Sequence, residues 1–189
     1  MLETASRLMQ DGLTPSVSEA AEAAGVSRAT AYRYFPSQAA LVQAVVDEGL
    51  GPILTWTPPA GGAEERVADL IATALPRIDA YEATFKAALK LSLDQWARRR
   101  AGTLGDEARF TRGHRIELLR EAVAPLEPTV TKAQRDRLAQ ALSLVFGVEA
   151  LLVLKDIWGL DSAETAAVAQ WAAAALVRSA RAEAGAGDA

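Results

Sequence analysis

Apolar residues recur every three or four positions through most of this 189-residue chain, the spacing that places side chains along one face of an α-helix. Alanine, leucine, glutamate and arginine, which all favour helices, fill most of the remaining positions. No segment alternates apolar and polar residues for long enough to predict a strand. We therefore expect an all-α fold with a sizeable core, because 50% of the residues are hydrophobic.

One segment interrupts the helical pattern more clearly than any other. The sequence GLGPILTWTPPAGG, at residues 49–62, carries glycine and proline at both ends, which is typical of a boundary. It predicts an N-terminal domain over residues 1–48, a linker region over 49–62 and a larger helical domain over 63–184. In the larger domain we expect helices at about 63–75, 78–100, 106–123, 131–158 and 162–183.

The composition restricts the chemistry that the chain can perform. With no cysteine, the chain has no disulfide, no thiolate nucleophile and no cysteine-bound metal. A single histidine, with neither a phosphate-binding glycine loop nor an H-E-x-x-H motif, leaves little for an enzyme beyond chemistry by Asp and Glu alone. We expect a protein that is not an enzyme and that needs no cofactor or metal.

The same sequence gives no sign of export or of a membrane span. The chain opens MLETASRLMQDG, with acidic residues where a signal peptide would carry basic and then apolar ones. The most apolar stretch, residues 142–160, is interrupted by Glu149, Lys155 and Asp156. We expect a cytoplasmic protein without a membrane partner.

Residues 25–35, GVSRATAYRYF, join two helical segments of only about seven residues each. Helices this short are not stable alone and must pack on a neighbour. Gly25 can take the positive φ that ends the first helix, and Ser27 can cap the second through its hydroxyl. The pattern predicts a helix-turn-helix, although a plain helical hairpin whose aromatic residues belong to the core would share much of it.

The second of these helices is expected to display groups that can bind DNA. Arg28 and Arg33 can contact guanine edges or phosphates, and the tyrosine hydroxyls can contact phosphate oxygens. Free amides at the helix starts near Ser16, Ser27 and Ser37 suit phosphate as well.

These motifs occur in register within SVSEAAEAAGVSRATAYRYFPSQAALVQAVV, residues 16–46, which resembles the N-terminal DNA-binding domain of the TetR family of transcriptional regulators. The resemblance covers about 45 residues, including the preceding helix, and it implies a three-helix DNA-binding domain on a larger domain for effector binding and dimerisation. By position, it implies DNA contacts from Ser16, Ser27, Arg28, Ala29, Thr30, Tyr32, Arg33, Tyr34 and Gln38.

The chain departs from the family pattern in ways that reduce its positive charge. Gln38 stands where members usually carry a phosphate-binding lysine, and the family's basic N-terminal arm has no counterpart. The first fifty residues carry three arginines against six acidic residues, a net charge of −3, and the whole chain has a net charge of −4. We therefore expect weak non-specific binding of DNA with a shallow salt dependence. Three explanations stay open: the protein reads DNA as it stands, this sequence lacks upstream residues, or DNA binding has been lost.

The larger domain suggests both an effector site and a dimer interface. Phe85, Leu89, Leu93, Trp96, Phe110 and His114 are the candidate ligand-binding residues, because the first four form a helical stripe. Such a stripe is either core or the lining of a pocket for an apolar or aromatic effector, a choice that the sequence leaves open. Helices near 131–158 and 162–183 are expected to form a homodimer, since the first is apolar on more than one face. Within it, Glu149 needs a partner, which we expect to be Arg112 or Arg115.

Two functions remain after this reading. The first is a ligand-responsive repressor that binds a palindromic operator in double-stranded DNA as a homodimer. The second is a helical small-molecule-binding or scaffold protein in which DNA binding is weakened or lost.

Overall fold

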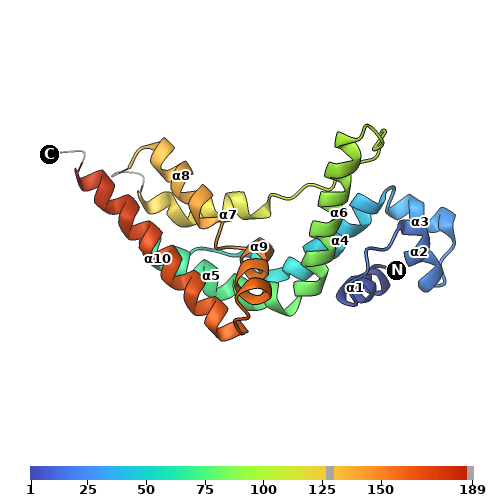
Figure 1. Cartoon of the computed structure of the whole chain (residues 1–189), viewed down its shortest axis with the longest axis horizontal. Coiled ribbons are helices and arrows are strands. Elements are labelled where there is room, and N and C mark those ends of the chain that lie inside the picture. Colours follow the sequence, from blue (N-terminus) through green and yellow to red (C-terminus); the bar gives the residue numbers. More distant parts are fainter. Residues whose placement is uncertain (127–129, 187–189) are drawn as a thin grey trace. The chain divides into compact units, whose positions relative to one another are not determined.

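The computed structural model describes residues 1–126 and 130–186, and the described residues form helices and loops with no strand (Figure 1). The all-α prediction is therefore confirmed. The α-helices are α1 Leu2–Gln10, α2 Val17–Ala23, α3 Arg28–Tyr34, α4 Gln38–Leu50, α5 Ala63–Ala80, α6 Glu82–Arg100, α7 His114–Val123, α8 Lys132–Leu142, α9 Val148–Leu151 and α10 Ser162–Ala186. Short 3₁₀ turns occupy Gly51–Thr55 and Ala124–Leu126, and a π-helical segment occupies Leu152–Ile157. Within the described part of the chain, no helix combines the length and apolar character that crossing a membrane requires.

The helices pack into two compact units that differ from a simple N-terminal and C-terminal division. The N-terminal unit contains Met1–Gly51 and also Tyr81–Arg112, whereas the C-terminal unit contains Pro52–Ala80 and the chain from Gly113 onward. Helix α6, which the sequence groups with the larger domain, thus packs with the first four helices. Its neighbours there are α1 and α4.

The core of the N-terminal unit lies between α1, α4 and α6. Met9, Leu41, Val42 and Val45 are fully buried, as the apolar spacing of α1 and α4 predicts. Helix α4 comes close to α6 at Gly49, where an added Cβ would lie 3.4 Å from Cδ1 of Tyr81 and 3.5 Å from Cζ of Phe85. A methyl group at this position would therefore make ordinary van der Waals contact with both rings.

The C-terminal unit is built around α5, which packs against α10 and α7, while α8 packs against α7 and α10. Small residues of α10, namely Ala169, Ala173 and Val177, are buried at this crossing. Helix α5 continues through Pro76 to Ala80, although the sequence suggested an end near residue 75. Burial of Leu75 and Ile78 on either side of the proline offsets the hydrogen bond that proline cannot donate.

Two helices expected from the sequence are shorter than predicted, for different reasons. The helix expected at 106–123 begins only at His114, because Gln95 holds residues 107–110 in a loop through hydrogen bonds to Glu107, Ala108 and Phe110. The helix expected at 131–158 is broken at Gly147, whose φ is 119°. The apolar run on both sides of Gly147 hid this break.

The break at Gly147 is held by Arg115, which occupies the space that a side chain would need. An added Cβ at Gly147 would lie 2.9 Å from Cζ of Arg115. Nη1 of Arg115 donates to the carbonyls of Ser143, at 3.1 Å, and Phe146, at 2.9 Å, while Nη2 lies 2.6 Å from Oε2 of Glu149. The predicted pairing of Glu149 with Arg115 is confirmed, and the carboxylate is half-buried.

A second polar cluster fixes the π-helical segment to the end of α5. Asp79 accepts hydrogen bonds from Nζ of Lys155 and from Oγ of Ser162, both at 2.6 Å. Burial alone would raise the pKa of the Asp79 carboxyl, but these two hydrogen bonds and the charge of Lys155 outweigh it and lower the pKa below its usual 3.8. The ionised carboxylate therefore stabilises the folded state.

We predict that Asp79→Asn lowers the stability of the folded protein at pH 7 by about 1 kcal/mol, because the charged partner of Lys155 is lost. Since the folded pKa is depressed, this stabilisation is complete above the ordinary pKa of 3.8 and disappears as the pH falls through the lower folded value. Thermal unfolding at pH 7 and at pH 3 should show the gap to wild type closing at low pH. Asp11→Asn, at an exposed aspartate, is the control and should show no such gap.

Candidate nucleic-acid interface

The site begins with the capping of α2, where Ser16 and Glu19 form a reciprocal pair. Oγ of Ser16 accepts from the amide of Glu19 at 3.2 Å, and Oε2 of Glu19 accepts from the amide of Ser16 at 2.7 Å. The hydrogen bond from the Ser16 amide, followed by that from its side chain, lowers the pKa of Glu19. The Ser16 amide is thus already paired within the protein, and its hydroxyl proton is the group that can still reach a phosphate.

The turn between α2 and α3 has the geometry that its sequence predicts. Gly25 has a φ of 64°, and the amide of Val26 donates to the carbonyl of Ala21 at 2.9 Å. Oγ of Ser27 accepts from the amide of Thr30 at 3.2 Å and caps α3. Ala21 and Ala31 are fully buried, so small residues bring the two short helices into close contact.

The outer face of α3 is free of the core. Arg28, Ala29, Tyr32, Arg33 and Tyr34 are exposed, and Thr30 is half-buried with its hydroxyl accepting from Ser27 at 2.9 Å. The Arg33 guanidinium lies 5.1 Å from the ring centre of Tyr34, and Oη of Tyr32 lies 3.3 Å from Oγ of Ser18. These contacts order long side chains in advance of binding, which lowers the entropy lost when they meet a ligand.

Gln38, at the start of α4, is used differently from the lysine usual at that position. Its Nε2 donates to the carbonyls of Thr14, at 3.0 Å, and Pro15, at 3.2 Å, while Ser37 caps α4 by accepting from the amide of Ala40 at 3.1 Å. Gln38 therefore ties the connection between α1 and α2 to α4, and brings no positive charge to the surface.

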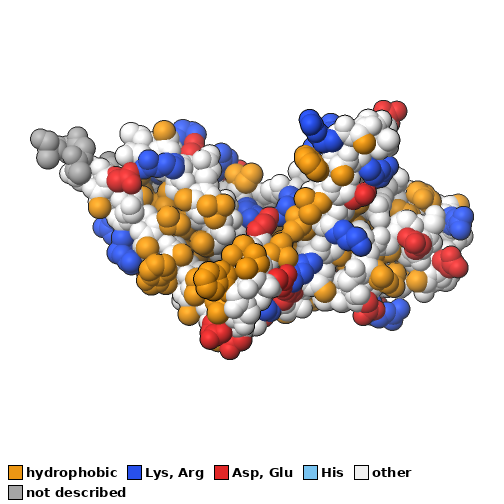
Figure 2. All heavy atoms as spheres, viewed as in Figure 1, with side chains coloured by type: hydrophobic (Ala, Val, Ile, Leu, Met, Phe, Trp, Pro, Cys, Tyr) orange, Lys and Arg blue, Asp and Glu red, His pale blue; other side chains and the backbone are white. Residues whose placement is uncertain are grey.

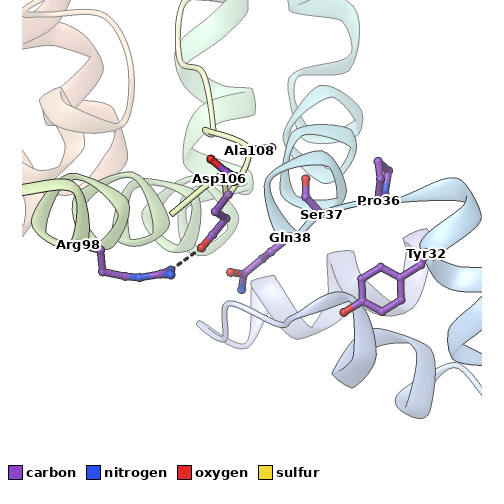
Figure 3. A pocket seen from close by; sticks show the side chains of 8 residues that line it. Tyr32, Pro36, Ser37, Gln38, Arg98, Asp106 and Ala108 are labelled. Atoms are coloured by element: carbon purple, nitrogen blue, oxygen red, sulfur yellow. Dashed lines mark ion pairs between the residues drawn. The ribbon is translucent and has the colours of Figure 1, made fainter. Parts of the chain in front are cut away.

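A cleft of about 520 Å³ lies beside these residues, within the N-terminal unit (Figure 3). One side is formed by Tyr32 and residues 36–38, and the other by Arg98 and residues 106–108 of the loop after α6. Sequence reasoning missed this second side. The run WARRR, residues 96–100, is in itself typical of a solvated face, and nothing local to it shows that the end of α6 lies next to the start of α4.

The candidate effector residues are spread over both units and over different environments. Phe85 and Phe110 are buried and Leu89 is half-buried, whereas Leu93 and Trp96 are 57% and 56% exposed. All five belong to the N-terminal unit, and the exposed His114 begins α7 in the C-terminal unit. As an effector site, this set stays a prediction.

These features define a helix-turn-helix, and comparison with known proteins shows what the chain resembles. Residues 2–45 match the model of the bacterial regulatory proteins of the tetR family. A TetR transcriptional regulator from Rhodococcus sp. RHA1 has a similar fold, with a TM-score of 0.55 and 20% sequence identity over 93% of this chain and 92% of that one. No curated protein matches the chain in sequence. The family match covers the helix-turn-helix region, and the structural likeness shows the fold of most of the chain.

We predict that Gln38→Lys strengthens DNA binding and steepens its salt dependence by about 1 in the log–log slope for each added phosphate contact. The carbonyls of Thr14 and Pro15 lose a shared donor, so the variant should also melt a few degrees lower. Fluorescence anisotropy titrations at several salt concentrations measure the first effect, and calorimetry measures the second. Gln38→Met, which loses the donor without adding charge, is the control. Equal salt slopes for both variants would show that this position does not face phosphate.

Proposed function

We propose that the protein is a ligand-responsive transcriptional repressor that binds a palindromic operator as a homodimer. The observation that carries this proposal is the outer face of α3, where five exposed side chains follow a capped, tight turn. A helix of this kind fits the major groove, where arginine can read guanine and tyrosine can contact the backbone. Residues 1–48 would read the operator, with Ser16, Ser27, Thr30 and Gln38 beside the phosphates.

A homodimer is supported by large apolar side chains that are exposed on the C-terminal unit. Ile157, Trp158 and Trp171 are 76%, 72% and 71% exposed, and Leu144, Val153 and Val168 add to this surface. Figure 2 shows hydrophobic side chains gathered over α9 and α10. Exposed apolar side chains gathered in this way mark an interaction site, and the two-fold symmetry of a homodimer suits a palindromic operator.

Helix α6 provides a route by which an effector could alter DNA binding. It carries the candidate ligand residues Phe85, Leu89, Leu93 and Trp96, and it packs on α1 and α4. An apolar effector that binds one position of α6 more tightly than another would shift the arrangement of the helices that support α3. This role needs no catalysis, and a regulator that acts on chromosomal DNA works in the cytoplasm.

A second candidate function rests on the charge of the first fifty residues. Their net charge of −3 and the use of Gln38 within the protein favour a small-molecule-binding or scaffold protein with weakened DNA binding. Measurement of DNA binding separates the two proposals directly.

We predict that the protein binds the DNA upstream of its own coding region, and that Arg33→Ala and Tyr32→Ala each weaken this binding. Loss of a base contact by arginine should cost about 1–3 kcal/mol, or roughly tenfold to hundredfold in affinity, and should relax specificity. Loss of the Tyr32 phosphate contact should weaken binding to all DNA sequences alike. Anisotropy titrations test this, with Lys90→Ala on α6 as the control. Unaltered affinity in both α3 variants would mean that α3 does not read DNA.

We predict that Trp158→Glu and Trp171→Glu convert the dimer to a monomer, because each places a charge in an apolar contact. Sedimentation equilibrium measures the mass directly. Trp96→Glu is the matched control, since Trp96 is also an exposed tryptophan but belongs to α6 of the N-terminal unit. A dimer that survives both substitutions would place the interface elsewhere.

A further inference from the structure

Residues 81–112, which pack with α1–α4 in the N-terminal unit, offset the negative charge of residues 1–51. Residues 81–112 carry seven basic and four acidic side chains, a net charge of +3, against −3 for residues 1–51. Most of this excess lies at the end of α6 and in the loop that follows, at Arg98, Arg99, Arg100, Arg109 and Arg112. Figure 2 shows Lys and Arg side chains at this end of α6.

The loop after α6 is held in place by Gln95, a polar residue that is only 5% exposed. Its Nε2 donates to the carbonyl of Ala108 at 3.0 Å and to Oε1 of Glu107 at 3.1 Å, and its Oε1 accepts from the amide of Phe110 at 2.8 Å. Leu104 and Phe110, which belong to this loop, are buried. The arginines are therefore carried by a defined surface of the N-terminal unit.

This surface meets the start of α4 across the cleft of Figure 3, where Arg98 lies opposite Tyr32. The TetR pattern assigns Tyr32 and Gln38 to the DNA backbone, and Ser37 presents a helix start beside them. Nη1 of Arg98 lies 2.7 Å from Oε2 of Glu107 and 3.8 Å from Oδ2 of Asp94, so this nitrogen faces two carboxylates, and the Nε and Nη2 donors are the ones that can reach a phosphate.

We propose that the end of α6 and its following loop form a second phosphate-binding surface, in which Arg98 contacts the DNA backbone across the cleft from Ser37 and Gln38. Three further arginines add to the positive electrostatic potential that attracts the DNA strand, namely the exposed Arg99, Arg100 and Arg109. The surface supplies charge that α1–α4 lack. Two acidic residues line the cleft, Asp106 and Glu107. Glu107 is paired with Arg98, whereas the exposed carboxylate of Asp106 would repel a phosphate bound there.

The test removes the Arg98 contact without changing the net charge of the protein. Arg98→Gln combined with Glu107→Gln deletes the ion pair, and the new amide oxygen at position 107 can still accept from Gln95. The control is Glu82→Gln with Lys86→Gln, which deletes a pair of 2.7 Å elsewhere on the same helix. Both full-length variants are titrated at several salt concentrations with the upstream duplex and with an unrelated duplex of equal length.

The Arg98/Glu107 variant should bind both duplexes about tenfold more weakly than wild type. The magnitude of its salt slope should fall by about 2, one phosphate for each subunit of a dimer. The control should match wild type, and Asp106→Asn should strengthen binding to both duplexes. Wild-type affinity and salt slope in the Arg98/Glu107 variant would overturn the inference.

The inference rests on the proposed DNA binding, and the two can fail separately. Wild type that binds neither duplex at low salt would contradict both. Wild type that binds while the Arg98/Glu107 variant and the control behave alike would contradict only the second surface.

Discussion

The close packing of two seven-residue helices governs what this protein can do with DNA. Neither α2 nor α3 is long enough to be stable alone, so the shape of the reading face depends on tertiary contacts. Ala21 and Ala31, both fully buried, allow the two helices to approach, and Gly25 sets the angle between them. Burial of these small residues leaves the arginine and tyrosine side chains of α3 on the outside.

The support for this pair extends beyond the three-helix region. Helix α6 packs on α1 and α4, and Gly49 of α4 lies beside Tyr81 and Phe85 at this crossing. The unit that presents α3 is therefore completed by a helix from later in the sequence. The same helix and the loop that follows it balance the charge of that unit, since residues 81–112 carry +3 against −3 for residues 1–51.

Local signals in the sequence were enough to predict most of the N-terminal helices. Ser16 and Ser27 act as caps, and Gly25 ends α2, because these roles depend on neighbours within a few residues. The pairing of Arg115 with Glu149 was also predictable, since a carboxylate in an apolar run requires a cation.

Features set by distant contacts could not be predicted in the same way. Helix α6 joins α1 and α4 through contacts more than thirty residues apart, and Gln95 orders residues 107–110 by tertiary hydrogen bonds. The break at Gly147 falls inside a continuous apolar pattern, which periodicity interprets as one helix. Similarly, Leu93 and Trp96 share a stripe with Phe85 but are exposed, because α6 buries only part of its apolar surface.

Hydrogen–deuterium exchange of the full-length protein, with and without its upstream duplex, tests the central claim most directly. The claim is that α3 and the end of α6 belong to one DNA-reading unit. The account predicts that duplex DNA slows exchange in residues 27–38 and in residues 98–112 together, and leaves the amides of α8 unchanged. Slower exchange in residues 27–38 alone, or in neither segment, would contradict the account.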